Sequence, residues 1–135
     1  MKPQADWSQP GPAKPDPSAI VEKPWGCEEL LVDGEYALKR LTVQPGQTLS
    51  LQYHRDKTET MVCVQGVGRI SLGRELGVVS PSSVFWLRPG VTVHVPAGIV
   101  HRVWSVGNHP LIIIEAATSA DPADIVRLED TYGRK

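Results

Sequence analysis

The sequence has little of several features that would direct it to a specialised class of protein. It contains only two cysteines, Cys27 and Cys63, in no metal-binding spacing, so we expect reduced thiols and a cytoplasmic protein. No apolar run reaches the roughly 18 residues that a membrane-spanning helix needs, and no apolar signal-peptide segment opens the chain. The formal net charge of −1 gives no electrostatic reason to expect nucleic acid or a membrane as a partner.

The sequence does contain many short segments of β-strand character. Residues 1–19 are rich in proline, so we expect a flexible tail there and one domain over residues 20–135. Short β-type runs then alternate with turns that contain glycine or proline, which is typical of an all-β sandwich or barrel. The expected strands are 36–43, 48–53, 58–65, 67–72, 84–87, 91–95, 102–106 and 111–117. One short helix is expected within residues 121–132, opened by Asp121 and Pro122.

Two glycine-framed motifs contain side chains that suit a metal ion. The first runs from Gly46 to Gly66 and holds Gln52, His54 and Glu59, and the second runs from Gly90 to Ser105 and holds His101. Gln52 and His54 are two residues apart in an expected strand, so their side chains leave the same face. A loop returns the chain to Glu59, and closure of a small barrel would bring His101 to the same place.

The chemistry of these four side chains predicts one divalent ion. Two imidazoles, one carboxylate and one amide oxygen suit Zn²⁺, Fe²⁺, Mn²⁺ or Ni²⁺, and they leave positions for water and substrate. Each side chain alone would more often be an ordinary polar group. Their joint spacing within the two motifs carries the prediction.

The two motifs resemble those of the cupin superfamily, with Gln52 where the first histidine usually stands. Five further segments, 22–26, 36–41, 45–54, 96–102 and 124–134, are similar to the type II mannose-6-phosphate isomerase. That domain is often fused behind a mannose-1-phosphate guanylyltransferase. The resemblance covers about residues 21–135. It implies a single cupin double-stranded β-helix (a small jelly-roll barrel), a divalent metal, commonly zinc, and interconversion of mannose 6-phosphate with fructose 6-phosphate.

One segment departs from the family pattern. The family usually reads His-His-His-Arg-x-Glu-His-Trp where this chain, from His54 to Met61, reads His-Arg-Asp-Lys-Thr-Glu-Thr-Met. His54 and Glu59 are kept while their neighbours differ. These differences affect the expected identity of the substrate more than the expected fold or metal binding.

A sugar-phosphate isomerase also needs a proton-transferring group and cations for the phosphate. Lys39 shares strand parity with Leu41 and Val43, so it is expected to point inward and act as the base. The arginines Arg102, Arg127 and Arg134, together with Lys23, are candidates for the phosphate. We place Arg102 with Lys39 in the catalytic set and the other three in the substrate-binding set, although any of them could be an ordinary surface charge.

Two other functions fit the same residues. Two histidines and one carboxylate also suit an Fe²⁺-dependent oxygenase that acts on a small molecule. The altered segment after His54 is compatible with a metal-holding cupin that binds a sugar without catalysis. Because exposed β-edges are often covered by pairing, we also expect a homodimer.

Overall fold

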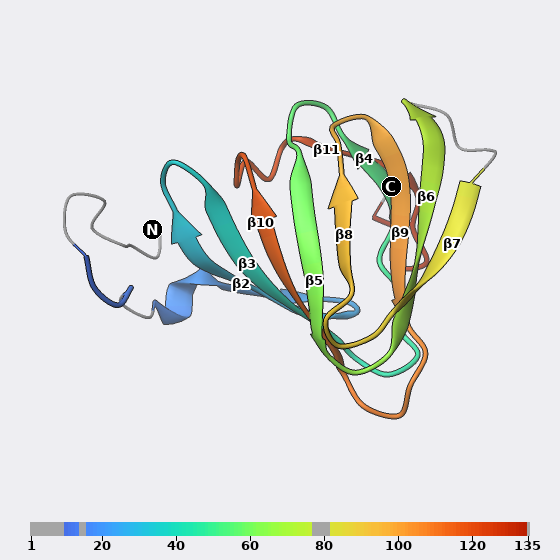
Figure 1. Cartoon of the computed structure of the whole chain (residues 1–135), viewed down its shortest axis with the longest axis horizontal. Coiled ribbons are helices and arrows are strands. Elements are labelled where there is room, and N and C mark those ends of the chain that lie inside the picture. The colour runs from blue at the N-terminus through green and yellow to red at the C-terminus, as the bar shows by residue number, and fades with distance from the viewer. Residues whose placement is uncertain (1–9, 14–15, 77–81, 135) are drawn as a thin grey trace.

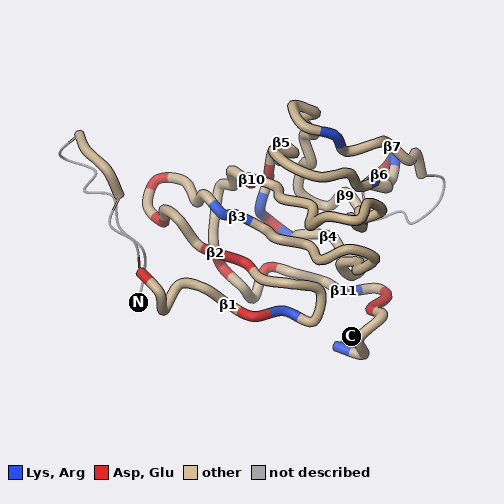
Figure 2. The backbone as a smooth tube through the Cα atoms, turned by 90° about the horizontal axis from the view of Figure 1, so that it is seen from below, with Lys and Arg blue, Asp and Glu red and all other residues tan. Residues whose placement is uncertain are grey.

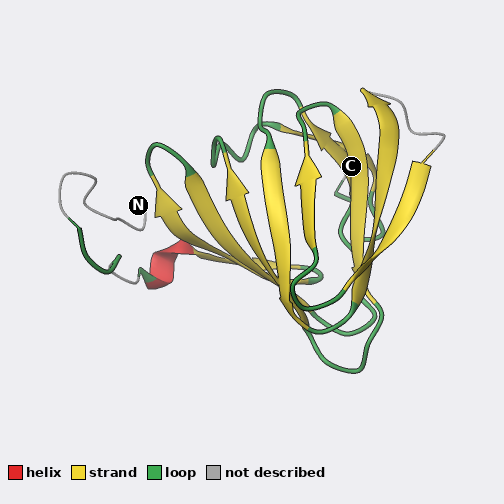
Figure 3. Ribbon diagram, in the orientation of Figure 1, coloured by secondary structure: helices red, strands yellow, loops and turns green. Residues whose placement is uncertain are grey.

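The chain folds into two antiparallel β-sheets that face each other and close into a small barrel (Figure 1). The computed structural model describes residues 10–13, 16–76 and 82–134. Their elements are η1 (Pro17–Ala19), β1 (Ile20–Lys23), β2 (Gly26–Asp33), β3 (Ala37–Val43), β4 (Leu51–His54), β5 (Glu59–Gln65), β6 (Gly68–Leu76), β7 (Ser82–Leu87), β8 (Thr92–Val95), β9 (Ile99–Ser105), β10 (Leu111–Ala117) and β11 (Ile125–Glu129). Strands dominate these residues, and η1 is a single 3-10 turn (Figure 3).

The strand order is that of a jelly roll. One sheet has the order β1-β2-β3-β10-β5-β8 and the other has the order β11-β4-β9-β6-β7. Neighbours within a sheet are often far apart in the chain, as where β3 pairs with β10 and β4 pairs with both β9 and β11. The predicted all-β class with a double-stranded β-helix is therefore confirmed. No helix among the described residues is long and apolar enough to cross a membrane.

Alternate residues of the strands point between the two sheets and form the core. In β5, Glu59, Met61 and Cys63 are buried while the residues between them are partly exposed, as the sequence pattern predicted. The core cluster comprises Trp25, Leu41, Val43, Leu49, Met61, Cys63, Ile70, Leu87, Val93, Val95, Val103, Leu111 and Ile113. Ionisable side chains are also buried at inward positions, namely His54, Lys57, Glu59, His101, Glu115 and Asp124. Burial of so many charged groups indicates a site, because such groups are rarely buried unless they are paired.

The helix predicted within residues 121–132 is wrong. The segment forms strand β11, which pairs with β4 so that Ile125 lies opposite His54 and Arg127 lies opposite Gln52. Pairing with the open edge of β4 gives the backbone N–H and C=O groups of this segment their hydrogen-bond partners. This tertiary contact overrides the local preference for a helix. Strands β1 and β2 were not predicted, because charged residues interrupt their apolar pattern.

The N-terminal region is described only in part. Residues 1–9 and 14–15 of the expected tail lie outside the described residues. Pro17–Ala19 forms η1, with the Asp16 carboxylate accepting a hydrogen bond from the Ser18 N–H at 3.0 Å, and Ala19 is buried. Figure 2 shows the strands that follow, β1 and β2, along the same side of the molecule as β11. This placement brings charged residues from both ends of the chain to one opening of the barrel.

Candidate metal centre

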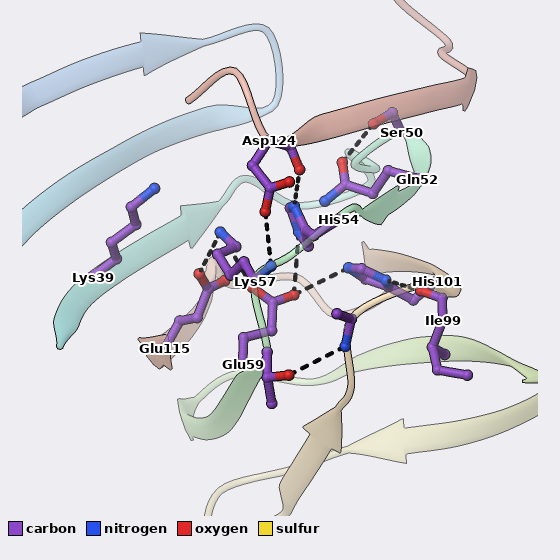
Figure 4. Close-up of polar contacts among 12 residues, drawn as sticks. Lys39, Ser50, Gln52, His54, Lys57, Glu59, Ile99, His101, Glu115 and Asp124 are labelled. Atoms are coloured by element: carbon purple, nitrogen blue, oxygen red, sulfur yellow. Dashed lines mark hydrogen bonds and ion pairs between the residues drawn. The ribbon is translucent and has the colours of Figure 1, made fainter. Parts of the chain in front are cut away.

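Three predicted metal ligands converge inside the barrel (Figure 4). His54 ends β4, Glu59 begins β5 and His101 lies in β9, and each is buried. Their candidate ligand atoms lie within 4.8 Å of one another. Glu59 Oε1 is 3.1 Å from His101 Nε2 and 3.5 Å from His54 Nε2. The two imidazoles and the carboxylate therefore face a common point.

Backbone carbonyls orient both imidazole rings. His54 Nδ1 lies 3.1 Å from the carbonyl oxygen of Asp124, and His101 Nδ1 lies 2.9 Å from that of Ile99. A ring whose Nδ1–H donates to a carbonyl presents the lone pair of Nε2, which is the usual arrangement of a metal-binding histidine. His101 Nε2 and Glu59 Oε2 are buried and make no hydrogen bond among the described residues, although Glu59 Oε1 lies 3.1 Å from the first and Lys57 Nζ lies 3.5 Å from the second. The donor set, gathered around one point, fits a divalent metal ion.

The turn of the second motif is hydrogen bonded to the first motif. Gly98 adopts φ +83°, a conformation that favours glycine, and its N–H donates to the carbonyl oxygen of His54 at 2.8 Å. Ala97 donates its N–H to the Thr58 hydroxyl at 3.3 Å. This contact explains why the glycine-containing turn precedes His101, since it holds the start of β9 beside the end of β4.

Gln52 lies in one cross-strand row with the candidate ligand His101. Gln52 of β4 pairs with His101 of β9 on one side and with Arg127 of β11 on the other. Its Oε1 accepts a hydrogen bond from the Ser50 hydroxyl at 2.6 Å, and its side chain lines the same pocket as His54. Metal ligation by Gln52 stays a prediction.

A pocket opens beside the candidate metal ligands. About 640 Å³ of space, counting the part that is open to solvent, lies between its walls. The lining residues are Lys23, Trp25, Glu28, Lys39, Leu41, Leu49, Gln52, His54, Lys57, Glu115, Asp121, Pro122, Ile125, Arg127 and Arg134. The structure thus brings together four of the five predicted basic residues, which are Lys23, Lys39, Arg127 and Arg134.

The basic residues of this pocket differ in how far acids neutralise them. Lys39 Nζ lies 3.0 Å from Glu28, which also lies 3.8 Å from Lys23. Arg134 is held by Asp130, whose pKa is lowered to about 2 by the hydrogen bonds from that guanidinium. Arg127 Nε is buried without a hydrogen-bond partner among the described residues. Arg127 is therefore the cation best placed to accept an anionic ligand.

The cations also act on one another. Desolvation is the main cause that lowers the pKa of Lys23, and the positive charges of Arg127, Lys39 and Arg134 add to it against the opposing effect of Glu28. Like charges that share one pocket are stabilised when an anion binds between them. This electrostatic arrangement favours a negatively charged ligand.

The structure does not bring Arg102 to this pocket. Arg102 follows His101 in β9, so the two side chains leave opposite faces of the sheet. Its guanidinium donates to the backbone oxygen of Glu129 at 3.4 Å, in a separate surface depression. Its predicted catalytic role therefore has no geometric support.

Two buried residues beside the metal ligands were missed by the sequence reasoning. Lys57 Nζ lies 3.5 Å from both Glu59 Oε2 and Glu115 Oε1. The inward parity of Glu115, shared with Ile113 and Ala117 in β10, was the available sequence signal. Lys57 lies in a loop, where no such periodicity exists.

The pKa values of the two neighbouring carboxyl groups, Glu59 and Glu115, shift in opposite directions. Desolvation opposes ionisation of Glu59, but the neighbouring His101 and His54 imidazoles hold its pKa well below the usual range. Desolvation and the neighbouring charge of Glu59 raise the pKa of Glu115 to about 8, although Lys57 counteracts them. The carboxylate that faces the histidines is thus the one that stays ionised, as a metal ligand must.

Asp124 organises the loop that joins His54 to Glu59. Its carboxylate accepts hydrogen bonds from the N–H groups of Arg55 at 2.9 Å, Asp56 at 3.0 Å and Lys57 at 2.8 Å. These bonds lower the pKa of Asp124 against the effect of desolvation. Because its backbone oxygen also faces His54, one residue fixes both the loop and a candidate metal ligand (Figure 4).

Comparison with known proteins identifies the family. A sequence model described as "Mannose-6-phosphate isomerase C-terminal" matches residues 16–130. The chain belongs to this family. It is a cupin domain, as the two opposed sheets and the buried His-Glu-His group indicate.

Relatives of this C-terminal family are longer proteins. Xanthan biosynthesis protein XanB of Xanthomonas campestris is 37% identical over 117 residues, which is 84% of this chain and 23% of that protein. Mannose-1-phosphate guanylyltransferase ManC of Salmonella typhimurium and alginate biosynthesis protein AlgA of Pseudomonas aeruginosa are each 33% identical with the same coverage. The chain therefore spans about a quarter of the length of these relatives.

Solved structures agree on the fold of this family member. The capsular polysaccharide assembling protein CapF from Staphylococcus aureus superimposes with a TM-score of 0.72 at 19% identity, over 82% of this chain and 34% of CapF. Bacillus subtilis oxalate decarboxylase, which has Mn(II) centres, superimposes with a TM-score of 0.69 at 22% identity, over 81% of this chain and 29% of the decarboxylase. At these identities the likeness supports the cupin fold and no particular reaction.

Proposed function

We propose that this chain is a metal-dependent sugar-phosphate isomerase that interconverts mannose 6-phosphate and fructose 6-phosphate. The observation that carries the proposal is the cross-strand row Arg127, Gln52 and His101. Neighbouring strands lie about 4.8 Å apart, so the phosphate-binding candidate and the metal-binding histidine are separated by about 10 Å along the sheet. A six-carbon sugar phosphate can bridge this separation with its phosphate at one end and its carbonyl at the other.

His54, Glu59 and His101 would hold the metal ion, with Gln52 as the proposed fourth ligand. When bound there, a divalent ion supplies electrostatic stabilisation of the negative charge that develops on the sugar oxygens. The family relationship and the convergence of the three candidate ligand atoms within 4.8 Å support this assignment. The identity of the metal, with zinc as our first choice and iron, manganese or nickel as the others, belongs to the proposal.

The pocket also contains groups that can move protons. Conversion of the aldose to the ketose takes a proton from C2 and returns one to C1, while a hydroxyl proton passes from O2 to O1, so the protein groups are restored after each turnover. Lys39 and Lys57 both line this pocket. Lys39 Nζ lies 3.0 Å from one acid, Glu28, whereas Lys57 Nζ lies 3.5 Å from both Glu59 and Glu115. Desolvation lowers the pKa of Lys57, but the charges of Glu115 and Glu59 outweigh it and raise that pKa, so Lys57 stays protonated. We therefore assign the proton transfer to Lys39, with Lys57 as a fixed positive charge beside Glu59.

Arg127 is the proposed phosphate anchor. Its partly buried guanidinium has an unpaired Nε, and a guanidinium binds phosphate through paired donors. Lys23 and Arg134 supply further positive charge, although Glu28 and Asp130 partly neutralise them. The substrate would thus be oriented by charge at the phosphate and by the metal at the carbonyl.

The decisive experiment measures fructose 6-phosphate formed from mannose 6-phosphate by the purified full chain. We expect turnover that is lost on chelation and restored by one equivalent of a divalent metal per chain. Oxygen consumption that depends on added Fe²⁺, with no isomerisation, would instead identify an oxygenase. A rise in melting temperature with mannose 6-phosphate and no turnover would identify a binding module, because a ligand that binds only the folded state must stabilise it.

A further inference from the structure

The outer face of the five-stranded sheet carries two tryptophans and an arginine in one cross-strand row. Arg69 of β6 lies opposite Trp86 of β7, the edge strand, on one side and Trp104 of β9 on the other (Figure 1). Ile70, the next residue of β6, is fully buried, so Arg69 points away from the core. Trp86 is 46% exposed and Trp104 is partly exposed. The row therefore faces solvent, on the opposite side of the sheet from the candidate metal centre.

Two guanidiniums lie over the Trp86 ring. The Arg69 guanidinium is 4.5 Å from the ring centroid, and that of Arg88, which follows β7, is 4.9 Å from it. Such cation–π contacts hold both positive charges beside the indole. Within the described ranges neither arginine forms a salt bridge, and Arg69 Nε is buried without a hydrogen-bond partner. Because buried N–H donors are normally paired, an acceptor oxygen is expected at this position.

Few acids lie near these two arginines. Glu75 is at the far end of β6 from Arg69. The turns at the end of the barrel where β6 begins and β7 ends contain no Asp or Glu, and they are residues 44–50, 66–67, 88–91 and 106–110. Arg102 of β9 is also on this face, but Glu129 and Asp130 line the same depression and offset its charge. The unopposed positive charges of this face are therefore those beside Trp86.

Two indoles with a guanidinium between them fit an acidic oligosaccharide. Sugar rings have apolar faces that can pack on an indole, and a carboxylate accepts paired hydrogen bonds from a guanidinium. Trp86 and Trp104 are two strand spacings apart, which is about 10 Å. A short extended oligosaccharide can thus place one ring at each indole and a carboxylate at Arg69. An open sheet face suits such an extended chain, because compact small molecules mostly bind in concave pockets.

Nucleic acid fits this face less well, although proteins that bind single strands also combine aromatic rings with positive charges. Such proteins present a broad basic surface, whereas this chain has a net charge of −1 and only a small basic region. A ligand with widely spaced carboxylates matches the two unopposed arginines better. We propose that the outer face of the five-stranded sheet binds an oligosaccharide that contains uronic acids. Arg69 and Arg88 bind its carboxylates, and Trp86 and Trp104 pack against its rings. This site lies outside the barrel and does not depend on the proposed isomerase activity.

The test is a titration of the isotope-labelled full chain with tetragalacturonate, followed by NMR of the indole N–H signals. We expect the signals of Trp86 and Trp104 to shift with a common dissociation constant. The signal of Trp25 should stay in place, because this side chain is 4% exposed in the core. The methyl-esterified tetramer keeps the sugar rings but lacks the charges, and it should bind at least about tenfold more weakly.

Variants of the row test the assigned contacts. Arg69→Gln should weaken tetragalacturonate binding by about 10–100-fold, because it removes charge-assisted hydrogen bonds. Trp86→Ala should weaken it by about 3–10-fold through loss of the ring contact. Arg88→Gln changes an exposed side chain and covers the case in which Arg69→Gln fails to fold. Arg40→Gln is the matched control, since this side chain is 43% exposed on the other sheet, and it should bind like the parent chain.

Shifts at both indoles that require the carboxylates and Arg69 or Arg88 support the proposal. It is overturned if tetragalacturonate shifts neither indole, if the methyl ester binds equally well, or if folded Arg69→Gln and Arg88→Gln keep the parent affinity. Tighter binding of a single-stranded oligonucleotide or of tetraglutamate than of tetragalacturonate would also overturn it, and would assign the face to that class of partner.

Discussion

Replacing Asp124 should loosen the metal centre without touching a ligand side chain. The Asp124 carboxylate accepts three backbone N–H bonds from Arg55, Asp56 and Lys57, and that from Lys57 is buried. In Asp124→Ala, the buried N–H loses its partner, at a cost of about 1–3 kcal/mol. The two part-buried N–H groups can be rehydrated and add about 0.5–1 kcal/mol each. We therefore expect a total loss of about 2–5 kcal/mol in the free energy of unfolding.

The same substitution should also weaken metal binding. The loop carries His54 at one end and Glu59 at the other, and changes that disturb the groups supporting metal ligands typically cost 10–100-fold in metal affinity. Urea unfolding of the metal-free protein and a competitive metal titration measure the two effects separately. Asp121→Ala is the control, because Asp121 is exposed and, within the part of the chain that the structure describes, its carboxylate accepts a hydrogen bond from the nearby Ala123 N–H alone. An Asp124→Ala protein that is as stable as this control would refute the assigned role.

Four further predictions concern the pocket and its charges. Glu59→Gln should lower metal affinity at least a hundredfold with the fold retained, as measured by competitive titration and circular dichroism, because it removes the only carboxylate of the triad. Lys39→Met should reduce kcat for mannose 6-phosphate by about 10²–10⁴ and leave KM within a few-fold, and an equal fall in Lys57→Met alone would move the role to Lys57. Arg127→Ala should raise KM for mannose 6-phosphate by about 10–100-fold with little change in metal affinity, since it removes charge-assisted hydrogen bonds of about 1.5–3 kcal/mol. Asp130→Asn should flatten the pH dependence of the free energy of unfolding between about pH 4 and 2. The pKa of Asp130 is about 2 in the folded chain and 3.8 in the unfolded chain, so its stabilising effect is present above pH 3.8 and is lost as the pH falls toward about 2.

Local patterns were enough to predict most of the fold. The alternation of Glu59, Met61 and Cys63 predicted which face of β5 is buried, because side chains in a strand alternate between faces. The same periodicity placed Gln52 and His54 on one face. Strands β1, β2 and β11 could not be predicted in this way, since each forms by pairing with another strand, β1 with β2, β2 with β3 and β11 with β4.

The metal triad was more predictable than the groups around it. His54, Glu59 and His101 sit at fixed places in two motifs, and the structure brings them within 4.8 Å of one another. The burial of Lys57 depends on its ion pair with Glu115, which lies in a strand far along the chain. No local pattern in the sequence therefore predicts that Lys57 is buried. Arg102 could have been set aside from the sequence, because adjacent residues of a strand cannot face the same pocket.

The most direct test of the central claim is proton exchange at C2 of mannose 6-phosphate in heavy water, followed by proton NMR. The isomerase proposal predicts loss of the C2 proton signal with the metal-loaded full chain, no loss after chelation, and recovery when metal is returned. His54→Ala should show no exchange at any metal concentration that leaves it folded. A metal-loaded, folded chain that leaves the C2 proton of mannose 6-phosphate in place would contradict the account.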